Sequence, residues 1–101
     1  FGNTDVVQAT KIEVLGASFQ TLSPDELRIY RLRNGVRVDN VYPGIFMQNG
    51  IRKGFIITSI NEKRTVSSED INEVIENAKN DVIYIEGIYP NGTVARYALK
   101  L

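Results

Sequence analysis

The sequence predicts an α+β fold in which an antiparallel sheet of about six strands is combined with two helices. Three observations support this prediction. Short runs rich in β-branched residues recur along the chain with turn residues between them, two helix-start signals interrupt these runs, and a Pro-Asn-Gly turn separates the last two. Strands that do not alternate regularly with helices are typical of α+β domains and not of parallel sheets.

The N-terminal part predicts a short tail followed by two strands. Residues 1–10 are polar and without periodicity, so we expect a linker or a frayed terminus there and a single domain over residues 11–101. Residues 11–15 alternate loosely and predict a first strand. Gly16 interrupts the pattern, and residues 17–21 predict a second short strand.

A first helix is predicted to begin after Ser23, which is a candidate N-cap. Pro24 occupies the first helical position, and Glu26 lies three residues past the serine, where its side chain completes a capping box. Capping explains Ser23 without a catalytic role. Arginines in and after this helix could bind an anionic partner, but the zero net charge favours an ordinary solvated surface; they are Arg28, Arg31, Arg33 and Arg37.

The middle of the chain, residues 34–61, predicts two strands joined by a corner and one helical turn. The first strand has β-branched residues on one face, and Pro43-Gly44 ends it. Gly50 suits the left-handed residue that terminates a helical turn. Gly54 then precedes the second apolar strand.

The last third predicts a short strand, the longest helix and a closing hairpin. Thr65-Val66 predicts the short strand, and Ser67 is the candidate cap of a helix whose first turn is acidic. Residues 82–89 and 93–101 predict two strands that flank the Pro90-Asn91-Gly92 turn.

Composition excludes several function classes. The chain has 101 residues, of which 43% are hydrophobic, and no apolar run approaches the roughly 20 residues of a membrane helix. A net charge of zero argues against nucleic acid as the main partner. The chain contains neither cysteine nor histidine, which excludes a disulfide and a Ser-His-Asp triad, and its acidic helix residues do not converge. We therefore expect no metal, no cofactor and no enzymatic activity in this chain.

Residues 34–61 resemble the centre of PDZ domains. The resemblance rests on Gly35-Val36, Pro43-Gly44, Gly50-Ile51, Gly54 and Ile60-Asn61. It implies a PDZ-like, partly open antiparallel β-sandwich or barrel. Gly16-Ala17 followed by LSPDEL is similar to the PDZ domains of bacterial Do-like (HtrA) serine proteases, especially a second, C-terminal one.

The resemblance also implies a binding site. In PDZ domains an apolar-Gly-apolar loop, here Val14-Leu15-Gly16-Ala17, captures the carboxylate of a peptide with its backbone amides. The peptide then pairs with the unpaired edge of the following strand, and a stripe of the late helix forms the other wall. The implied peptide-binding residues are Leu15, Gly16, Ala17, Ser18, Phe19, Gln20, Ser68, Asn72 and Ile75.

Two function classes follow from these expectations. The first is a peptide-binding module of a larger serine endopeptidase of the periplasm or cell envelope, which binds C-terminal peptides of unfolded proteins. Its partners would include the protease domain of the same chain, and the parent would be a homo-oligomer. The second is a docking domain whose groove is filled by its own chain or by a neighbour. The chain departs from the family pattern at Phe55 and at Ile45-Phe46-Met47, which predicts an exposed or partner-covered apolar patch. Because it starts at Phe1 without a signal sequence, we interpret it as part of a longer protein.

Overall fold

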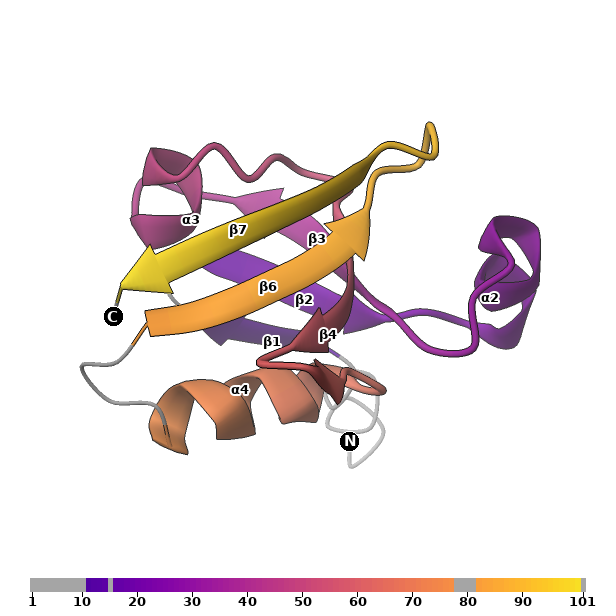
Figure 1. Ribbon diagram of the computed structural model, residues 1–101, viewed down its shortest axis with the longest axis horizontal. Coiled ribbons are helices and arrows are strands. Elements are labelled where there is room, and N and C mark those ends of the chain that lie inside the picture. Colours follow the sequence, from indigo (N-terminus) through magenta and orange to yellow (C-terminus); the bar gives the residue numbers. More distant parts are fainter. Residues whose placement is uncertain (1–10, 15, 78–81, 101) are drawn as a thin grey trace, which may run out of the picture.

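The central feature of the fold is an antiparallel sheet (Figure 1). The computed structural model describes residues 11–14, 16–77 and 82–100. The strands are Lys11–Val14 (β1), Ala17–Thr21 (β2), Val36–Val41 (β3), Ile56–Ile60 (β4), Lys63–Arg64 (β5), Val82–Ile88 (β6) and Val94–Lys100 (β7). They are ordered β1-β2-β3-β4-β6-β7, and β5 pairs with β4. Since β1 and β7 lie at opposite ends of this order, the sheet is not closed, and the predicted α+β class is confirmed.

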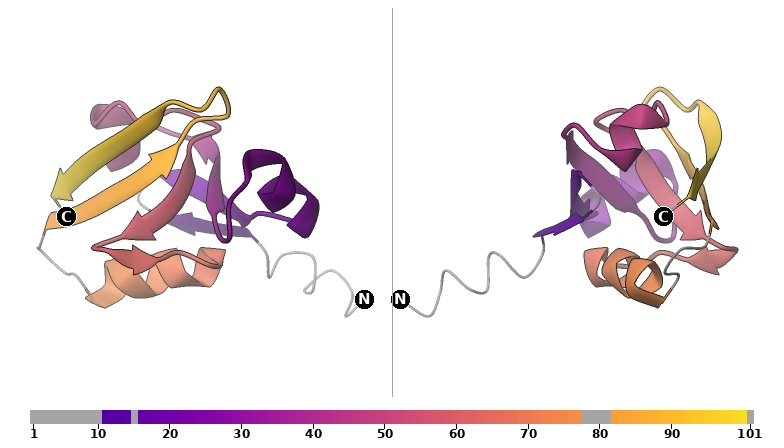
Figure 2. Two further views of the ribbon diagram at one scale, coloured as in Figure 1. Left: turned by 45° about the vertical axis from the view of Figure 1, so that its right-hand side comes forward. Right: turned by 90° about the vertical axis from the view of Figure 1, so that its left-hand side faces the viewer.

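Three short helices accompany the sheet within the described residues. They are Pro24–Tyr30 (α2), Ile45–Gln48 (α3) and Ser68–Asn77 (α4). The capping box predicted for α2 is present, because the Ser23 hydroxyl accepts from the Glu26 N–H and the Glu26 carboxylate accepts from the Ser23 N–H. Helix α2 buries no residue and projects from one end of the sheet, whereas α4 runs along it (Figures 1 and 2). No helix in the described ranges is long and apolar enough to span a membrane.

The core forms where the curved sheet wraps over its own inner face. Phe19 of β2 meets Phe46 of α3 edge to face, with the ring centroids 5.4 Å apart. Phe55 makes the same type of contact with Tyr97 of β7 at 5.3 Å. The first contact joins β2 to α3, and the second joins the residue before β4 to the last strand. Other fully buried core side chains include Val36, Val38, Ile51, Ile57, Ile60, Ile71, Ile83, Ile85 and Leu99.

Two local predictions are wrong. The short strand comprises Lys63–Arg64 and not Thr65-Val66, because Asn61 and Glu62 both adopt positive φ (52° and 66°) and form a tight turn from which β5 starts at once. The apolar patch expected at residues 45–47 is largely absent, since Phe46 is completely buried and only Met47 is exposed there.

Candidate functional site

The predicted groove lies between β2 and α4, and the structure places these two elements together. Helix α4 contacts both β1 and β2, and β1 lies between them (Figure 1). Ile71 of α4 is fully buried, and Val74 and Ile75 pack against the core. The helix is therefore held against the core by an apolar face.

One end of the groove is the turn between β1 and β2. Gly16 adopts φ +80°, and its carbonyl accepts a hydrogen bond from the Tyr42 N–H at 2.7 Å. A Cβ atom at this position would lie 3.2 Å from Gly44 Cα and 3.3 Å from the Pro43 carbonyl oxygen. Both the backbone conformation and the close approach therefore require glycine here. Leu15, which was also predicted for this loop, lies outside the described residues.

The other end of the groove is pinned by hydrogen bonds between β2 and α4. The Ser68 N–H donates to the Thr21 Oγ1 at 2.9 Å, and the two hydroxyls are 3.5 Å apart. Ser68 is fully buried. This contact joins the last residue of β2 to the first residue of α4, so it holds the two elements together at this end of the predicted groove.

The remaining predicted residues divide between the strand wall and the helix wall. On β2, Ala17, Ser18 and Phe19 are buried and Gln20 is half-buried. On α4, Asn72 and Ile75 are half-buried. The Ser18 hydroxyl is buried and has no hydrogen-bond partner within the described part of the chain. That these residues contact a peptide stays a prediction.

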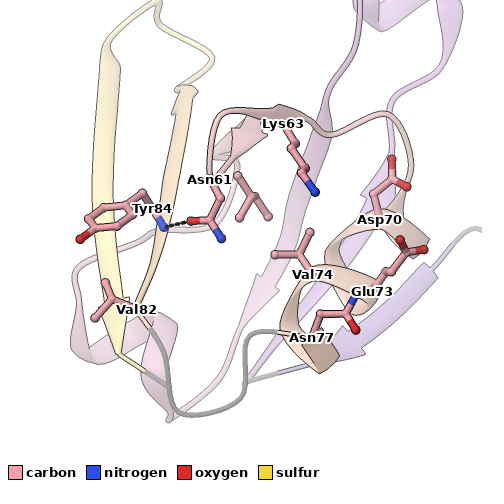
Figure 3. Close-up of a pocket in the computed structure, with 9 residues that line it drawn as sticks. Asn61, Lys63, Asp70, Glu73, Val74, Asn77, Val82 and Tyr84 are labelled. Carbon is pink, nitrogen blue, oxygen red and sulfur yellow. Dashed lines mark hydrogen bonds between the residues drawn. The ribbon is translucent and has the colours of Figure 1, made fainter.

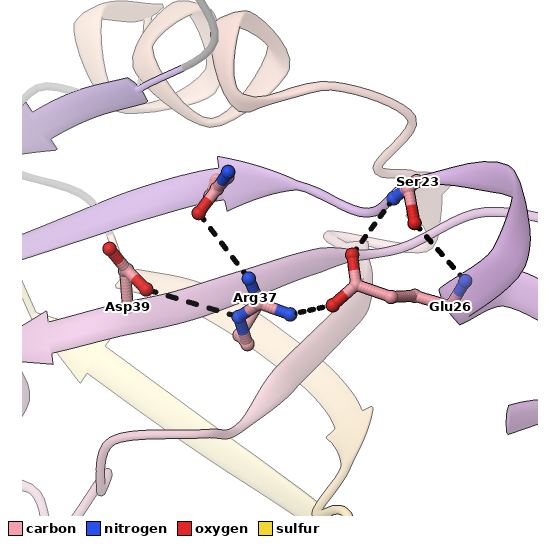
Figure 4. A network of polar contacts seen from close by, with 5 residues as sticks. Ser23, Glu26, Arg37 and Asp39 are labelled. Atoms are coloured by element: carbon pink, nitrogen blue, oxygen red, sulfur yellow. Dashed lines mark hydrogen bonds and ion pairs between the residues drawn. The ribbon is translucent and has the colours of Figure 1, made fainter. Parts of the chain in front are cut away.

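A charged network centred on Arg37 of β3 contacts β2 through Gln20 (Figure 4). Its guanidinium donates to the Gln20 Oε1 at 3.3 Å, forms an ion pair with Glu26 and lies 3.9 Å from the Asp39 carboxylate. The hydrogen bond from the Ser23 N–H is the main cause that lowers the pKa of Glu26 below its ordinary value, and Arg37 lowers it further. Partial burial has the opposite effect and raises it. Arg37 is thus used within the fold and is not part of a free basic surface.

The expectation of an unpaired edge on β2 is wrong. Strand β1 pairs with β2 in antiparallel register, from Val14 opposite Ala17 to Lys11 opposite Gln20. The opposite edge of β2 pairs with β3. Both edges of β2 are therefore occupied, and the edge predicted for a peptide is filled by the chain's own first strand.

Sequence reasoning predicted the strand at residues 11–15 but missed its place in the groove. The signal was present, because the strand-like runs at residues 11–15 and 17–21 are separated only by Gly16, and so short a connection is typical of a tight hairpin. Thr21 was also missed, since its role depends on the position of α4, which is distant in sequence.

A separate cleft of about 630 Å³ lies on another side of α4 (Figure 3). It is lined by Ile60, Asn61, Lys63, Asp70, Glu73, Val74, Asn77, Val82 and Tyr84, none of which was predicted for the groove. The Asp70 carboxylate in its wall accepts from the N–H groups of Val66 and Ser67 and thereby caps α4. Across the ranges that the structure describes, no group of three or more acidic side chains could hold a metal ion.

Comparisons with known proteins agree with this architecture. A solved structure of the HtrA3 PDZ domain bound to a phage-derived ligand (FGRWV) is similar in fold, with a TM-score of 0.73 and 20% sequence identity over 89% of this chain and 85% of that chain. No curated protein matches the sequence. The family of PDZ-like domains matches residues 7–81, which is well over half of the chain. The chain is therefore a member of the PDZ-like domain family.

Proposed function

We propose that this chain is a peptide-binding module that captures apolar C-terminal ends of unfolded proteins by strand addition to β2. One observation carries the proposal. The space between β2 and α4 already accommodates an extended strand, β1, which runs antiparallel to β2. A peptide bound by strand addition would take the same direction and place its last residue near the Gly16 turn.

The chemistry of the walls favours an apolar peptide end. Ala17 and Phe19 are buried beside the turn and belong to the hydrophobic core. Glycine at positive φ allows successive backbone N–H groups to converge on an anion, which would supply the carboxylate site without a basic side chain. The HtrA3 PDZ domain in the similar structure is bound to a peptide ending in valine, which supports the same ligand class.

We further propose that the parent protein is a Do-like (HtrA) serine endopeptidase of the periplasm or cell envelope. The support is the sequence resemblance at Gly16-Ala17 and LSPDEL, together with the similar fold of the HtrA3 domain. The chain contains no histidine, so the catalytic triad would belong to a protease domain elsewhere in that protein, whose assembly would be homo-oligomeric.

A docking domain is the second candidate function. The observation in its favour is that β1 fills the groove. A groove permanently closed by its own chain would bind no peptide and would serve only to hold neighbouring domains in place.

An NMR titration separates the two functions. The probes are two versions of one five-residue peptide ending in valine, one with a free carboxylate and one amidated. We expect the free acid to bind with a Kd around micromolar, which corresponds to about −8 kcal/mol, and to shift resonances of residues 16–20 and 68–77. Amidation should weaken binding by about 1–2 kcal/mol through the loss of charge-assisted hydrogen bonds.

Equal binding of both peptides would exclude capture of the carboxylate. No shift with either peptide at any concentration up to millimolar would favour the docking domain.

A further inference from the structure

We propose that residues Lys11–Val14 act as an internal ligand of the groove, which an incoming peptide must displace before it can pair with β2. This inference rests on the proposed peptide-binding function and assigns its regulation. Four consecutive residue pairs join β1 to β2, and they cover residues 17–20 of the five-residue strand β2. The groove is thus occupied over nearly its whole length.

Occupation by β1 and by a peptide is mutually exclusive. A strand has two hydrogen-bonding edges, and the second edge of β2 is used by β3 over residues 17–21. No edge of β2 remains for a peptide while β1 is in place. The same strand also separates β2 from α4, so it blocks both walls of the groove at once.

The sequence of β1 has the pattern that the groove is proposed to select. Ile12 and Val14 are β-branched and alternate with the charged residues Lys11 and Glu13. In the observed register Val14 lies opposite Ala17 and Ile12 opposite Phe19, which are both core residues. A displacing peptide should therefore carry apolar residues at its last position and two positions before it, because these would take the places of Val14 and Ile12.

The walls do not depend on β1. The Thr21–Ser68 contact, the hydrogen bond from Tyr42 to Gly16 and the β2–β3 ladder involve no residue of β1, so they do not have to break when β1 leaves. Strand β1 is also an edge strand of only four residues. Its release would therefore open a formed groove without unfolding the sheet.

The consequence is a weaker apparent affinity. When the binding-competent state is a minor fraction of the molecules, the apparent Kd is the intrinsic Kd divided by that fraction. A closed-to-open ratio of about 99:1 would weaken peptide binding roughly a hundredfold. Any change that weakens the pairing of β1 with β2 would raise the open fraction and so recover part of the lost affinity.

A reversible disulfide between β1 and β2, introduced in the whole chain, tests the inference. In a two-residue hairpin the pair next to the turn exchanges hydrogen bonds, so the next pair, Glu13 and Ser18, is of the non-hydrogen-bonded type with Cα atoms about 4.5 Å apart, within the range of a disulfide. The chain has no cysteine, so the double variant E13C/S18C would form one defined bond. The free-acid valine peptide should bind the reduced form and lose at least tenfold in affinity on oxidation, as the open fraction vanishes.

The control is a second disulfide on the exposed face of the β6–β7 hairpin, where Tyr84 pairs with Ala98. Oxidation of Y84C/A98C should leave the peptide affinity unchanged. Equal affinity of oxidised and reduced E13C/S18C would overturn the internal-ligand proposal while peptide binding itself stands. Absence of binding to every form, including the reduced ones, would refute peptide binding and the internal ligand together.

A second pair of variants changes the affinity in the opposite direction. Ile12→Asp places a charge at a position opposite Phe19 and should release β1, which would tighten peptide binding about tenfold if the closed-to-open ratio falls from 99:1 to 9:1. The same substitution at Val94, an exposed residue at the start of the other edge strand, should have no effect on binding. Unchanged or weaker binding by a folded Ile12→Asp variant would contradict the proposal.

Discussion

Among the described glycines, Gly87 is the one where an added side chain would meet its neighbours most closely. It lies in β6 opposite Ile57, where the β4–β6 register shifts. A Cβ atom there would lie 1.9 Å from the Ile56 carbonyl oxygen and 2.9 Å from the Phe55 ring. The obstacle is backbone, so it cannot be relieved by a change of rotamer, and the two strands would have to separate.

We predict that Gly87→Ala destabilises the domain by about 3 kcal/mol or more, which is the upper part of the range for overpacked sites. Gly92→Ala is the matched control. Gly92 has a positive φ of +91°, but an added Cβ would meet nothing within 4 Å, so we expect only the cost of the left-handed conformation, about 1–2 kcal/mol. Urea denaturation of both variants measures the difference. A smaller loss for Gly87→Ala than for Gly92→Ala would contradict the predicted clash.

Residue-level predictions from the sequence succeeded where the cause was local. The Ser23 capping box and the positive φ of Gly50 depend on a few neighbouring residues, and both are confirmed. The need for glycine at position 87 could not be predicted from neighbouring residues in the sequence. It arises from the approach of β4, whose position is set by the packing of the whole sheet.

At the scale of elements, a hydrogen bond joins the end of β2 to the start of α4. The Thr21 hydroxyl accepts from the Ser68 N–H, and Ser68 is buried. We predict that Thr21→Val, which keeps the shape of the side chain but removes the acceptor, destabilises the domain by about 1–2 kcal/mol. Urea denaturation measures this loss.

Amide hydrogen exchange should show the effect mainly at the start of α4. Thr93→Val, at an exposed position in the β6–β7 loop, is the control and should change stability by less than about 0.5 kcal/mol. Faster exchange spread evenly over the domain, with no excess at residues 68–71, would show that Thr21 does not anchor the helix.

Most helices and strands were predicted from the sequence, but the pairing of the strands was predicted only in part. Alternation and turn residues located the strands, because one face of each is buried. The partners of β2 were predicted incompletely, since the family resemblance favoured an open loop at residues 14–17 over the tight hairpin that the structure has. Local patterns specify which segments are strands, and the three-dimensional arrangement decides which edges remain free.

For the whole molecule, the aromatic cluster of Phe55, Tyr89 and Tyr97 links stability to alkaline pH. The Tyr89 and Tyr97 hydroxyl oxygens are 2.6 Å apart. Burial, followed by the hydrogen bond and the electrostatic effect of Tyr89, raises the pKa of Tyr97 from 10.0 to about 12. The neutral phenol is therefore favoured by folding. Its stabilising contribution is complete below pH 10 and is lost as the pH rises through about 12.

We predict that the free energy of unfolding falls between pH 10 and 12 and that Tyr97→Phe reduces this fall. The control is Tyr84→Phe, because the Tyr84 side chain is exposed on the outer face of β6. Chemical denaturation at a series of pH values, combined with phenolate absorbance, measures both quantities. The same pH dependence in Tyr97→Phe and the original chain would rule out Tyr97 as its source.

The hairpin of β1 and β2 also gives the domain a mechanical property. The chain enters the sheet at Lys11, the end of β1 farthest from the turn, and the hydrogen bonds of an antiparallel pair lie across the strands. Tension applied through residues 1–10 would load these bonds one pair at a time, starting with Ile12 and Phe19, the hydrogen-bonded pair nearest to Lys11, and would detach β1 progressively toward the turn. Once free, its four residues would lengthen the N-terminal arm by about 13 Å. The reach of that arm and the accessibility of the groove are thus set by the same strand.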